Sequence, residues 1–553
     1  MKIDRWIIAG AGALGTAILL KVFLLAVNSV PFNADEAVVA LMARHITQGA
    51  RPAFFYGQSY MGSLDAFLIA SGFRIFGDHV WVVRFVQILL YTATLASTVW
   101  VGKKAFGDFR VGILAIWLLA IPTVNVTLYT TVTLGGYGEM LLIGNLILLS
   151  GFRIANKLLG NGSEDKWWDW MIIGFLTGLG LWAFGLTLVY GIPIGIYLIW
   201  VFWKRPSDQK DQRYILGRTV WIKLGKIVVL VSCGFLLGAM PWIVYAWQNG
   251  PIELLNEMRG GAIAGVEGLP WVLQNIQHLF NFLLLGLTVI IGMRPPWEIR
   301  WLALQLIPLV LFFWIGVLVF TVYQLIRRNY LRVERIIVVL GVGITLIMAF
   351  ILTPFGADPS GRYFLPLAII IALLAADMIL KLKTKFGRWA YGLAGMIILF
   401  QFWGTVQLIL INPPGLTTQF DAVTQIDHSY DEKLINFLLE NDELRGYNNY
   451  WVAYPLAFKS REKMIYVPRL PYHQDFRYNE RDDRYDPYDL AVEEAEHVAY
   501  ITTNHPELNI YIRKQLNDLG VTWREQQIGD YLIFYALSEL IRPKDIGLGE
   551  TTP

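Results

Sequence analysis

The sequence is poor in charge and in cysteine. Only 16% of its 553 residues are Asp, Glu, Lys or Arg, and a soluble protein of this length needs far more polar surface. A single cysteine, Cys233, excludes an intrachain disulfide and leaves the redox compartment open. P-loop and GxSxG motifs are missing, and His45 and His79 lack the spacing of metal ligands. We expect no metal or cofactor, and nothing in the sequence indicates a nucleic-acid partner.

Long apolar runs dominate the chain instead. It is 55% hydrophobic with a mean hydropathy of +0.48, and apolar runs of about 17 to 25 residues, each able to cross a bilayer, recur along it. The sequence predicts an α-helical polytopic protein of the plasma (inner) membrane with about eleven spans. The first span is expected to stay uncleaved, because it lacks a clear small-x-small site. We place the spans at 6–28, 80–101, 110–128, 137–153, 169–186, 188–203, 226–246, 303–326, 335–354, 363–380 and 389–411.

Basic loops indicate the orientation. Several Lys- and Arg-rich stretches all fall on one side of the membrane if the N-terminus is cytoplasmic. These stretches are 204–226, 327–335, 381–388 and the group Lys103, Lys104 and Arg110. The loops 29–79 and 247–302 and the C-terminal tail then lie outside. We expect the apolar segment 279–293 to be re-entrant or interfacial, because counting it as a span would turn 327–335 to the outside.

Residues 412–553 form an acidic tail. They carry 14 Lys and Arg against 24 Asp and Glu, a net charge of −10, while residues 1–411 carry 32 against 19, a net charge of +13. Helix-like stretches alternate in the tail with strand-like runs. The helix-like stretches are 431–440 and 507–520, and the strand-like runs are 450–458, 463–468, 497–503 and 530–537. We therefore expect a transmembrane domain at 1–411 and a small extracytoplasmic α/β domain at 412–553.

Two adjacent carboxylates follow the first span, in "NSVPFNADEAVVALMARHI" (28–46). Asn33 suits a helix N-cap, with Glu36 three residues on as in a capping box. One interpretation is therefore that the pair merely starts a surface helix. The other adds chemistry: Asp35, held at the membrane surface and favoured as an anion by the helix dipole, is well placed to take a proton from a hydroxyl as a general base.

Further polar side chains are predicted at the outer ends of other spans. Glu139 follows the glycine-rich "TLGGYG", Arg84 begins the second span, and Arg362 with Tyr363 begins the tenth. Arginines bind phosphate well, although Arg84 and Arg362 could equally extend to the interface without a ligand. Aromatic residues make up 14% of the chain. Most are expected in interface belts, and candidates for stacking on a sugar are Tyr56, Tyr60 and Tyr137.

Taken together, these features resemble the GT-C superfamily of integral-membrane glycosyltransferases. The acidic pair after span one, the acid near span four and "GRYFLPL" (361–367) carry the resemblance, as does "FFYGQSYMGSLDAFLIASGFRIFGDHVWVVRF" (54–85). The branch is that of protein O-mannosyltransferases, aminoarabinose transferases and bacterial lipopolysaccharide-core transferases. Where the aminoarabinose transferases have "RY" behind "DE", this chain has Ala37 and Val38, so that substrate is not implied.

The resemblance implies a fold and a reaction. Such enzymes transfer a sugar, with inversion, from a polyprenyl-phosphate donor to an extracytoplasmic protein, lipid or polysaccharide. Monophosphate donors generally need no metal. By position, the implied roles are general base for Asp35, its partner for Glu36, second-loop acid for Glu139, and donor-phosphate contacts for Arg362, Tyr363 and Arg84.

Two other classes of function remain open. A transporter or flippase of lipid-linked sugars would place charges mid-span in broken helices, whereas here they gather at predicted outer ends. A non-catalytic scaffold or sensor, binding partners through its acidic tail, would make those carboxylates dispensable.

Overall fold

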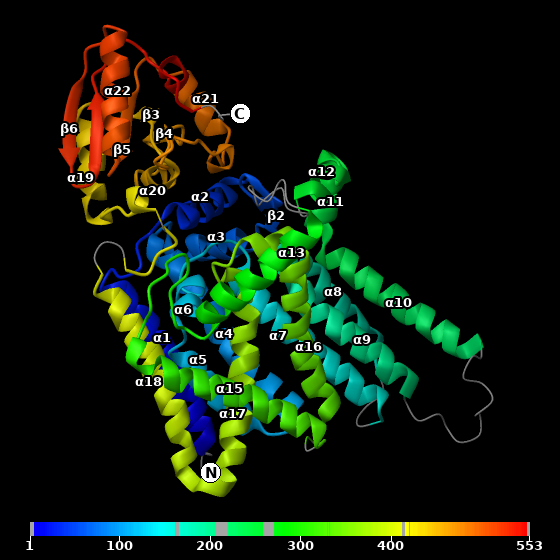
Figure 1. The fold of residues 1–553 in the computed structure, drawn as a ribbon. Helices are drawn as coiled ribbons and strands as arrows, with labels where there is room; N and C mark the ends of the chain where they lie inside the picture. Colours follow the sequence, from blue (N-terminus) through cyan, green and yellow to red (C-terminus); the bar gives the residue numbers. More distant parts are fainter. Residues whose placement is uncertain are drawn as a thin grey trace.

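The computed structural model is a bundle of helices with the tail packed against one end (Figure 1). The structure describes residues 5–160, 165–204, 218–257, 270–328, 330, 332–411, 415–419 and 421–549. The end of the bundle that carries the tail is called the tail side below. The predicted fold class, a polytopic helical protein with a small α/β domain, is confirmed.

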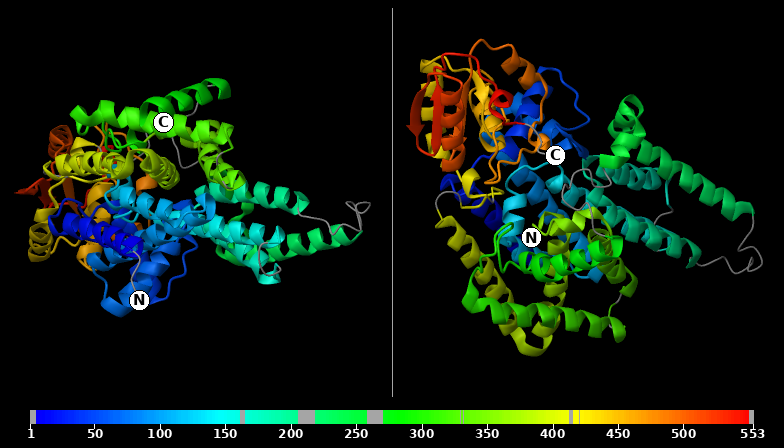
Figure 2. Two further views of the ribbon diagram at one scale, coloured as in Figure 1. Left: turned by 90° about the horizontal axis from the view of Figure 1, so that it is seen from below. Right: turned by 45° about the horizontal axis from the view of Figure 1, so that its top comes forward.

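Within these ranges, nine helical stretches are long and apolar enough to cross a membrane. They are Arg5–Ala26 (α1), Val80–Phe106 (α4), Tyr137–Leu158 (α7), Gly185–Lys204 (with α9, Leu188–Lys204), Val220–Gly238 (in α10, Arg218–Gly238), Trp271–Ile290, Leu304–Ile326 (with α15, Ile307–Ile326), Val333–Leu352 (α16) and Arg362–Ile409, which contains α17 (Leu365–Phe386) and α18 (Tyr391–Ile409). The helix α8 (Trp167–Ala183) and its neighbours α9 and α10 extend away from the rest of the bundle (Figure 2).

Some predicted span boundaries were wrong. The span expected at 110–128 is two helices, α5 (Phe109–Ala120) and α6 (Val124–Tyr129). Pro122 separates them, because it has no N–H to donate and disfavours helical backbone in the residue before it. The span expected at 226–246 is likewise divided, since α10 ends at Gly238 and α11 (Met240–Asn249) follows with a proline in its first turn.

The apolar stretch Trp271–Ile290 is helical throughout. It comprises α13 (Trp271–Phe280), a π-helical turn (Asn281–Gly286) and α14 (Leu287–Ile290). His278 Nδ1 lies 2.9 Å from the carbonyl oxygen of Ile351, and the Asn281 amide donates to the carbonyl of Gly356 at 2.9 Å. Ile351 is in the last turn of α16, and Gly356 is in the 3-10 turn Pro354–Ala357 that follows it. The stretch is long and apolar enough to cross a membrane, so the interfacial placement stays a prediction.

The first loop on the tail side contains two helices and a hairpin. They are α2 (Ala34–Gln48), β1 (Phe54–Phe55), β2 (Gln58–Gly62) and α3 (Leu64–Phe76). As predicted, Asn33 caps α2, its side-chain oxygen accepting from the backbone N–H of Glu36 at 3.3 Å. The tail covers α2, so most of its side chains are buried rather than only one face. A short helix, α12 (Pro251–Asn256), follows α11 on the same side.

The loop between α6 and α7 is fixed from two sides. Lys21 of α1, 2% exposed, donates to the carbonyl and hydroxyl of Thr130 and to the hydroxyl of Thr131 at 2.7–2.8 Å. Gly136 has a φ of +68°, and a Cβ there would lie 2.5 Å from the Ala183 carbonyl oxygen. Glycine at position 136 therefore lets this loop approach the backbone of Ala183 closely.

The tail contains a mixed sheet in the order β4–β3–β5–β7–β6, in which β3 is parallel to β4 and β5, and β7 is antiparallel to β5 and β6. Its strands are β3 (Arg445–Tyr447), β4 (Ile465–Val467), β5 (Ala499–Thr503), β6 (Arg524–Ile528) and β7 (Tyr531–Tyr535). Its helices are α19 (Asp431–Glu440), α20 (Tyr450–Lys459), α21 (Pro487–Glu493) and α22 (Pro506–Asp518).

One predicted strand of the tail is a helix. Residues 450–458 form most of α20, capped by Asn449, whose side-chain oxygen accepts from the Trp451 N–H at 3.0 Å. The helix packs between α2 and the sheet and is buried on every side. It therefore lacks the polar face that marks an amphipathic helix in a sequence.

Polar contacts join the tail to α2. Arg44 donates to the carbonyl of Phe458 at 3.0 Å and pairs with Glu462 at 3.4 Å. His45 Nε2 lies 2.8 Å from Glu462 Oε1, which also accepts from the Tyr488 hydroxyl at 2.8 Å. Burial opposes ionisation of Glu462, but these partners outweigh it and lower its pKa below the ordinary value. Glu462 thus links the tail to α2 through Arg44 and His45.

We predict that Glu462→Gln loosens the docking of the tail. The change removes the charge that Arg44 faces, and hydrogen bonds to charged groups contribute about 1.5–3 kcal/mol. Backbone amides of α2 and α20 should exchange hydrogen faster than in wild type, while Glu440→Gln at the exposed end of α19 should change nothing. Because the folded-state pKa of Glu462 is lowered, wild type should show the same loosening as the pH falls through that pKa. Unchanged exchange in Glu462→Gln would contradict this role.

Candidate active site

Asp35 lies where the tail meets the bundle. It is in the first turn of α2 and half-buried. Its carboxylate accepts from the Tyr450 hydroxyl at 2.7 Å and from the Thr418 hydroxyl at 3.2 Å, both from the tail. Thr418 in turn accepts from the Asn33 side-chain amide at 2.8 Å. Asp35 is therefore an oriented carboxylate that solvent, or a substrate, can still reach.

Glu36, one residue further on, points into the bundle. It is fully buried and forms an ion pair with Arg84 of α4, which is 3% exposed. Its other oxygen accepts from the backbone N–H of Thr133 at 3.3 Å, while Arg84 also donates to the Pro31 carbonyl at 3.1 Å. Burial raises the pKa of Glu36 to about 7, and Arg84 limits that rise. The pair fastens the start of α2 to α4.

Glu139 lies deeper, away from the tail. It is in the first turn of α7, 2% exposed, beside Asp65 of α3. Asp65 accepts from the Gln87 amide at 2.9 Å and from the Thr133 hydroxyl. Burial, and then the neighbouring Glu139, raise the pKa of Asp65 well above its ordinary value. No described contact joins Glu139 to Asp35, so its predicted catalytic role remains a prediction that this geometry does not strengthen.

Arg362 and Tyr363 stand at the tail-side start of α17. Arg362 pairs with Asp358 at 2.6 Å, and its guanidinium lies 5.0 Å from the ring centre of Tyr363 and 5.7 Å from that of Trp297. Tyr60 and Tyr137 are close enough to interact with it electrostatically. Two of the predicted sugar-stacking tyrosines therefore surround a predicted phosphate ligand. The third, Tyr56, instead stacks on Tyr485 of the tail, 4.6 Å between ring centres.

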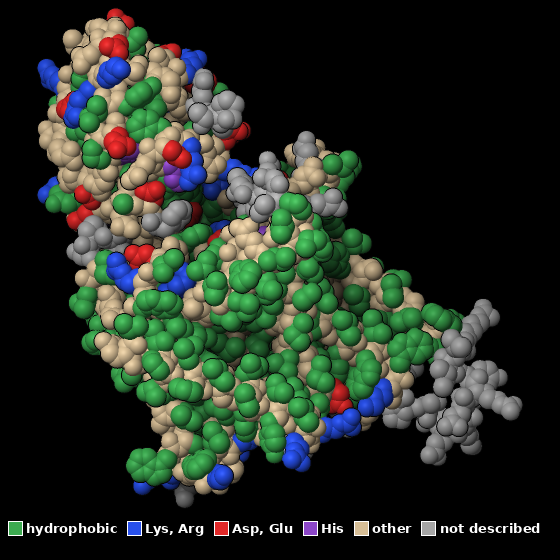
Figure 3. Space-filling model, viewed as in Figure 1, with side chains coloured by type: hydrophobic (Ala, Val, Ile, Leu, Met, Phe, Trp, Pro, Cys, Tyr) green, Lys and Arg blue, Asp and Glu red, His purple; other side chains and the backbone are tan. Residues whose placement is uncertain are grey.

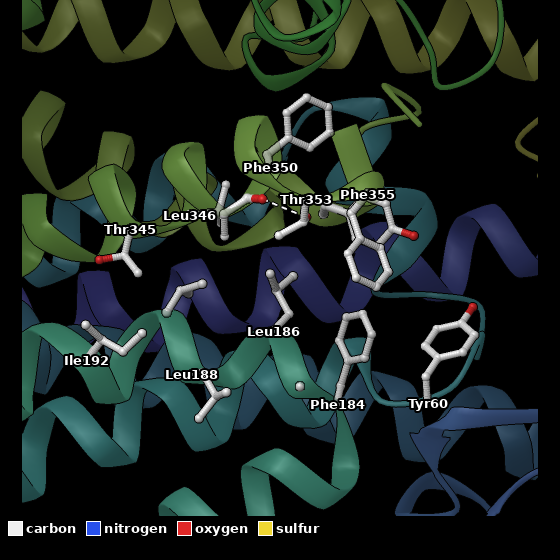
Figure 4. A pocket seen from close by; sticks show the side chains of 14 residues that line it. Tyr60, Phe184, Leu186, Leu188, Ile192, Thr345, Leu346, Phe350, Thr353 and Phe355 are labelled. Atoms are coloured by element: carbon white, nitrogen blue, oxygen red, sulfur yellow. Dashed lines mark hydrogen bonds between the residues drawn. The ribbon is translucent and has the colours of Figure 1, made fainter. Parts of the chain in front are cut away.

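An apolar cavity of about 290 Å³ lies between α9 and α16 (Figure 4), and Tyr363, the residue after this arginine, lines part of it. Aliphatic side chains such as Ile192, Leu188 and Leu346 line its length, and aromatic rings, including Tyr60 and Phe355, stand at one end. Its complete lining is Tyr60, Phe184, Gly185, Leu186, Leu188, Val189, Ile192, Thr345, Leu346, Ala349, Phe350, Thr353, Phe355 and Tyr363. The cavity suits a hydrocarbon chain whose polar end reaches Tyr60 and Tyr363.

The tail contributes residues that the sequence analysis missed. Besides Tyr450 and Thr418, Arg484 holds its guanidinium over the ring of Tyr450, 5.4 Å away, and over that of Phe55, 5.9 Å away. Burial raises the pKa of the neighbouring Asp482 to about 7. In the sequence these two residues belong to "ERDDRYD", a charged run that carries no local sign of burial.

The comparisons with known proteins agree with one another. Residues 63–245 match the family model "dolichyl-phosphate-mannose-protein mannosyltransferase", while no curated protein sequence matches the chain significantly. The structure is similar to ArnT from Cupriavidus metallidurans bound to undecaprenyl phosphate, with TM-score 0.59, 11% identity, and coverage of 96% of this chain and 98% of that one. The apo structure of ArnT matches with TM-score 0.57 and 12% identity, and the match covers 96% of this chain and 97% of that one. The apo oligosaccharyltransferase of Archaeoglobus fulgidus matches with TM-score 0.49 and 13% identity, and the match covers 89% of this chain and 69% of that one.

These findings confirm the predicted resemblance. The chain shares the fold of ArnT over nearly its whole length. The family match, although limited to residues 63–245, is to a glycosyltransferase family. The chain is thus a membrane glycosyltransferase, and its acceptor and base are considered under the proposed function.

The ion pair of Glu36 and Arg84 generates a stability prediction. Glu36→Leu leaves Arg84 buried without a counter-charge, and breaking one side of a buried pair costs about 3–5 kcal/mol. We expect a markedly lower unfolding midpoint in detergent. The double variant Glu36→Leu/Arg84→Met removes both charges and should recover most of the loss. A single variant as stable as wild type would show that the pair does not anchor α2.

Proposed function

We propose that this protein transfers a sugar, with inversion, from a polyprenyl-phosphate donor to an extracytoplasmic acceptor, with Asp35 as general base. The observation that carries the proposal is the position of Asp35. Its half-buried carboxylate lies at the junction of tail and bundle, on the same side as the aromatic end of an apolar cavity. The acceptor is a protein, lipid or polysaccharide that presents a hydroxyl.

The donor side of the proposal rests on the cavity between α9 and α16. A polyprenyl chain would lie along its aliphatic walls, which places the phosphate near Tyr363 and Arg362. ArnT, which shares the fold, has been solved with undecaprenyl phosphate bound. Arginine is well suited to bind phosphate oxygens, and Tyr60 and Tyr137 beside Arg362 would contact the sugar.

In the proposed step Asp35 takes the proton of the acceptor hydroxyl. The acceptor oxygen forms a bond to the anomeric carbon while the bond from that carbon to the phosphate oxygen breaks, and polyprenyl phosphate leaves. The hydrogen bonds from Tyr450 and Thr418 hold the carboxylate in one orientation. General-base catalysis of this kind contributes about 10²–10⁴-fold.

Glu36 and Arg84 would act by position rather than by contact with substrate. Glu36 fixes the turn that presents Asp35. Arg84, predicted to assist at the phosphate, already has a carboxylate partner and a 3% exposed side chain. We assign both residues to anchoring α2.

The proposed orientation places the tail outside the cell. Lys and Arg side chains gather at the end of the bundle opposite the tail (Figure 3), as the positive-inside rule expects of a cytoplasmic face. A transmembrane domain at 1–411 in the plasma membrane and an extracytoplasmic domain at 412–553 follow from this orientation. The donor and the acceptor would then meet on the outer face.

We predict that the turnover rate of Asp35→Asn is at least about 10²-fold lower than that of wild type, while its binding of the donor is retained. The measurement follows the loss of a panel of polyprenyl-phosphate sugars in nanodiscs, with cell-envelope extract as acceptor. The matched control is Asp475→Asn, since Asp475 is an exposed carboxylate of the tail. Equal turnover in wild type and Asp35→Asn would remove Asp35 from the chemistry.

The cavity generates a second prediction. Ala349→Trp would fill the space between α9 and α16 and should raise the donor KM at least about 10-fold, because overpacking and lost apolar contact both oppose a lipid chain there. On the same helix, Met348 is 48% exposed and does not line the cavity, so Met348→Trp is the control. If both variants keep the wild-type donor KM, the chain binds elsewhere.

A further inference from the structure

The arginines near the site differ in how their charge is balanced. Arg84 pairs with Glu36, and Arg362 pairs with Asp358 at 2.6 Å. For Arg484, by contrast, no carboxylate among the described residues lies within the 4.0 Å limit of an ion pair. Its Nε is buried and has no hydrogen-bond partner among them. Asp482 and Asp35 stabilise the Arg484 charge from beyond ion-pair distance, so no described carboxylate occupies its N–H groups, and an anion can pair with them directly.

Arg484 faces the donor end of the site. With the Gln58 side-chain oxygen turned toward it, that oxygen accepts from Nη1 at 2.5 Å and from Nη2 at 2.9 Å, and the Gln58 amide then donates to the Tyr60 hydroxyl at 3.3 Å. Tyr60 lines the end of the apolar cavity and interacts electrostatically with both Arg362 and Arg484. The two arginines, one from the bundle and one from the tail, therefore flank the same tyrosine.

We propose that Arg484 binds the phosphate of the lipid-linked donor, so that the tail completes the donor site. This inference rests on the proposed function. A guanidinium presents parallel N–H donors that match two phosphate oxygens, and the neutral Gln58 oxygen it contacts now is a weaker acceptor that a phosphate would replace. Arg362, which keeps its ion pair with Asp358, would be the second guanidinium beside the donor phosphate.

The role also fits the chemistry of the leaving group. As the bond to the anomeric carbon breaks, negative charge grows on the departing phosphate, and a fixed cation stabilises such charge most in a site shielded from water. Arg484 also interacts electrostatically with Asp35. It therefore neighbours both the proposed base and Tyr60, on a tail segment that Tyr454 holds by accepting from the Arg484 backbone N–H at 2.6 Å.

The test compares a lipid that carries the phosphate with one that lacks it. Full-length wild type, Arg484→Gln and Arg484→Lys are placed in nanodiscs, and binding of undecaprenyl phosphate and of undecaprenol is titrated. Arg484→Gln should weaken the binding of undecaprenyl phosphate at least about 10-fold and leave the binding of undecaprenol unchanged. Arg484→Lys should bind undecaprenyl phosphate with an affinity between those of wild type and Arg484→Gln. Arg477→Gln, at an exposed arginine nearby in the tail, should match wild type.

The outcomes separate this inference from the proposed function. If wild type binds undecaprenyl phosphate and Arg484→Gln binds it within twofold as well, Arg484 does not contact the phosphate. Equal weakening of both lipids by Arg484→Gln would assign it a structural role and overturn the proposal. Should Arg484→Gln fail to fold, Arg484→Lys decides, because a phosphate contact predicts weakening of the phosphate lipid alone. A wild type that binds neither lipid would overturn the proposed function itself.

Discussion

The buried ion pair between Glu36 and Arg84 is the constraint on which the site depends. Successive side chains of a helix point about 100° apart, so fixing Glu36 inside the bundle leaves Asp35 facing the tail. Desolvating two charges is expensive, and the cost is met here by hydrogen bonds from Arg84 to the Pro31 carbonyl and from the Thr133 N–H to Glu36. Lys21 fixes Thr130 and Thr131 of the same loop, and Thr133 itself also donates to Asp65. A structural pair inside the bundle thereby orients a chemical group outside it.

The site is shared between two parts of the chain that are far apart in sequence. The bundle supplies the start of α2, the cavity between α9 and α16, and Arg362. The tail supplies Tyr450 and Thr418 to Asp35, and in our proposal Arg484 to the donor. In our proposal, docking of the tail through Glu462 is therefore required for activity. In our proposal the tail forms one wall of the active site, and where it covers α2 it leaves Asp35 half-buried.

Sequence reasoning reached the features that local patterns encode. Apolar runs predicted the spans, Asn33 and Glu36 predicted the capped start of α2, and the tail's alternation predicted an α/β domain. Sequence reasoning missed the features that arise when a segment is buried by another segment far away in the sequence. The segment 450–458 is a helix without a polar face, because α2 covers the side that would otherwise meet water. Arg484 lies in a charged run that looks solvated, and only packing against the hairpin β1–β2 gives it a role. Glu139 appeared to belong with Asp35, yet the fold places it beside Asp65.

A structure of the full chain in nanodiscs with undecaprenyl phosphate tests the central claim most directly. The account predicts the phosphate between Arg362 and Arg484, near Tyr60, with the hydrocarbon chain along the cavity between α9 and α16 and Asp35 facing the space beyond. Gln58 should have lost its contact with Arg484. A phosphate bound away from the tail, with Arg484 still on Gln58 and the cavity free of lipid, would contradict a site built jointly by bundle and tail.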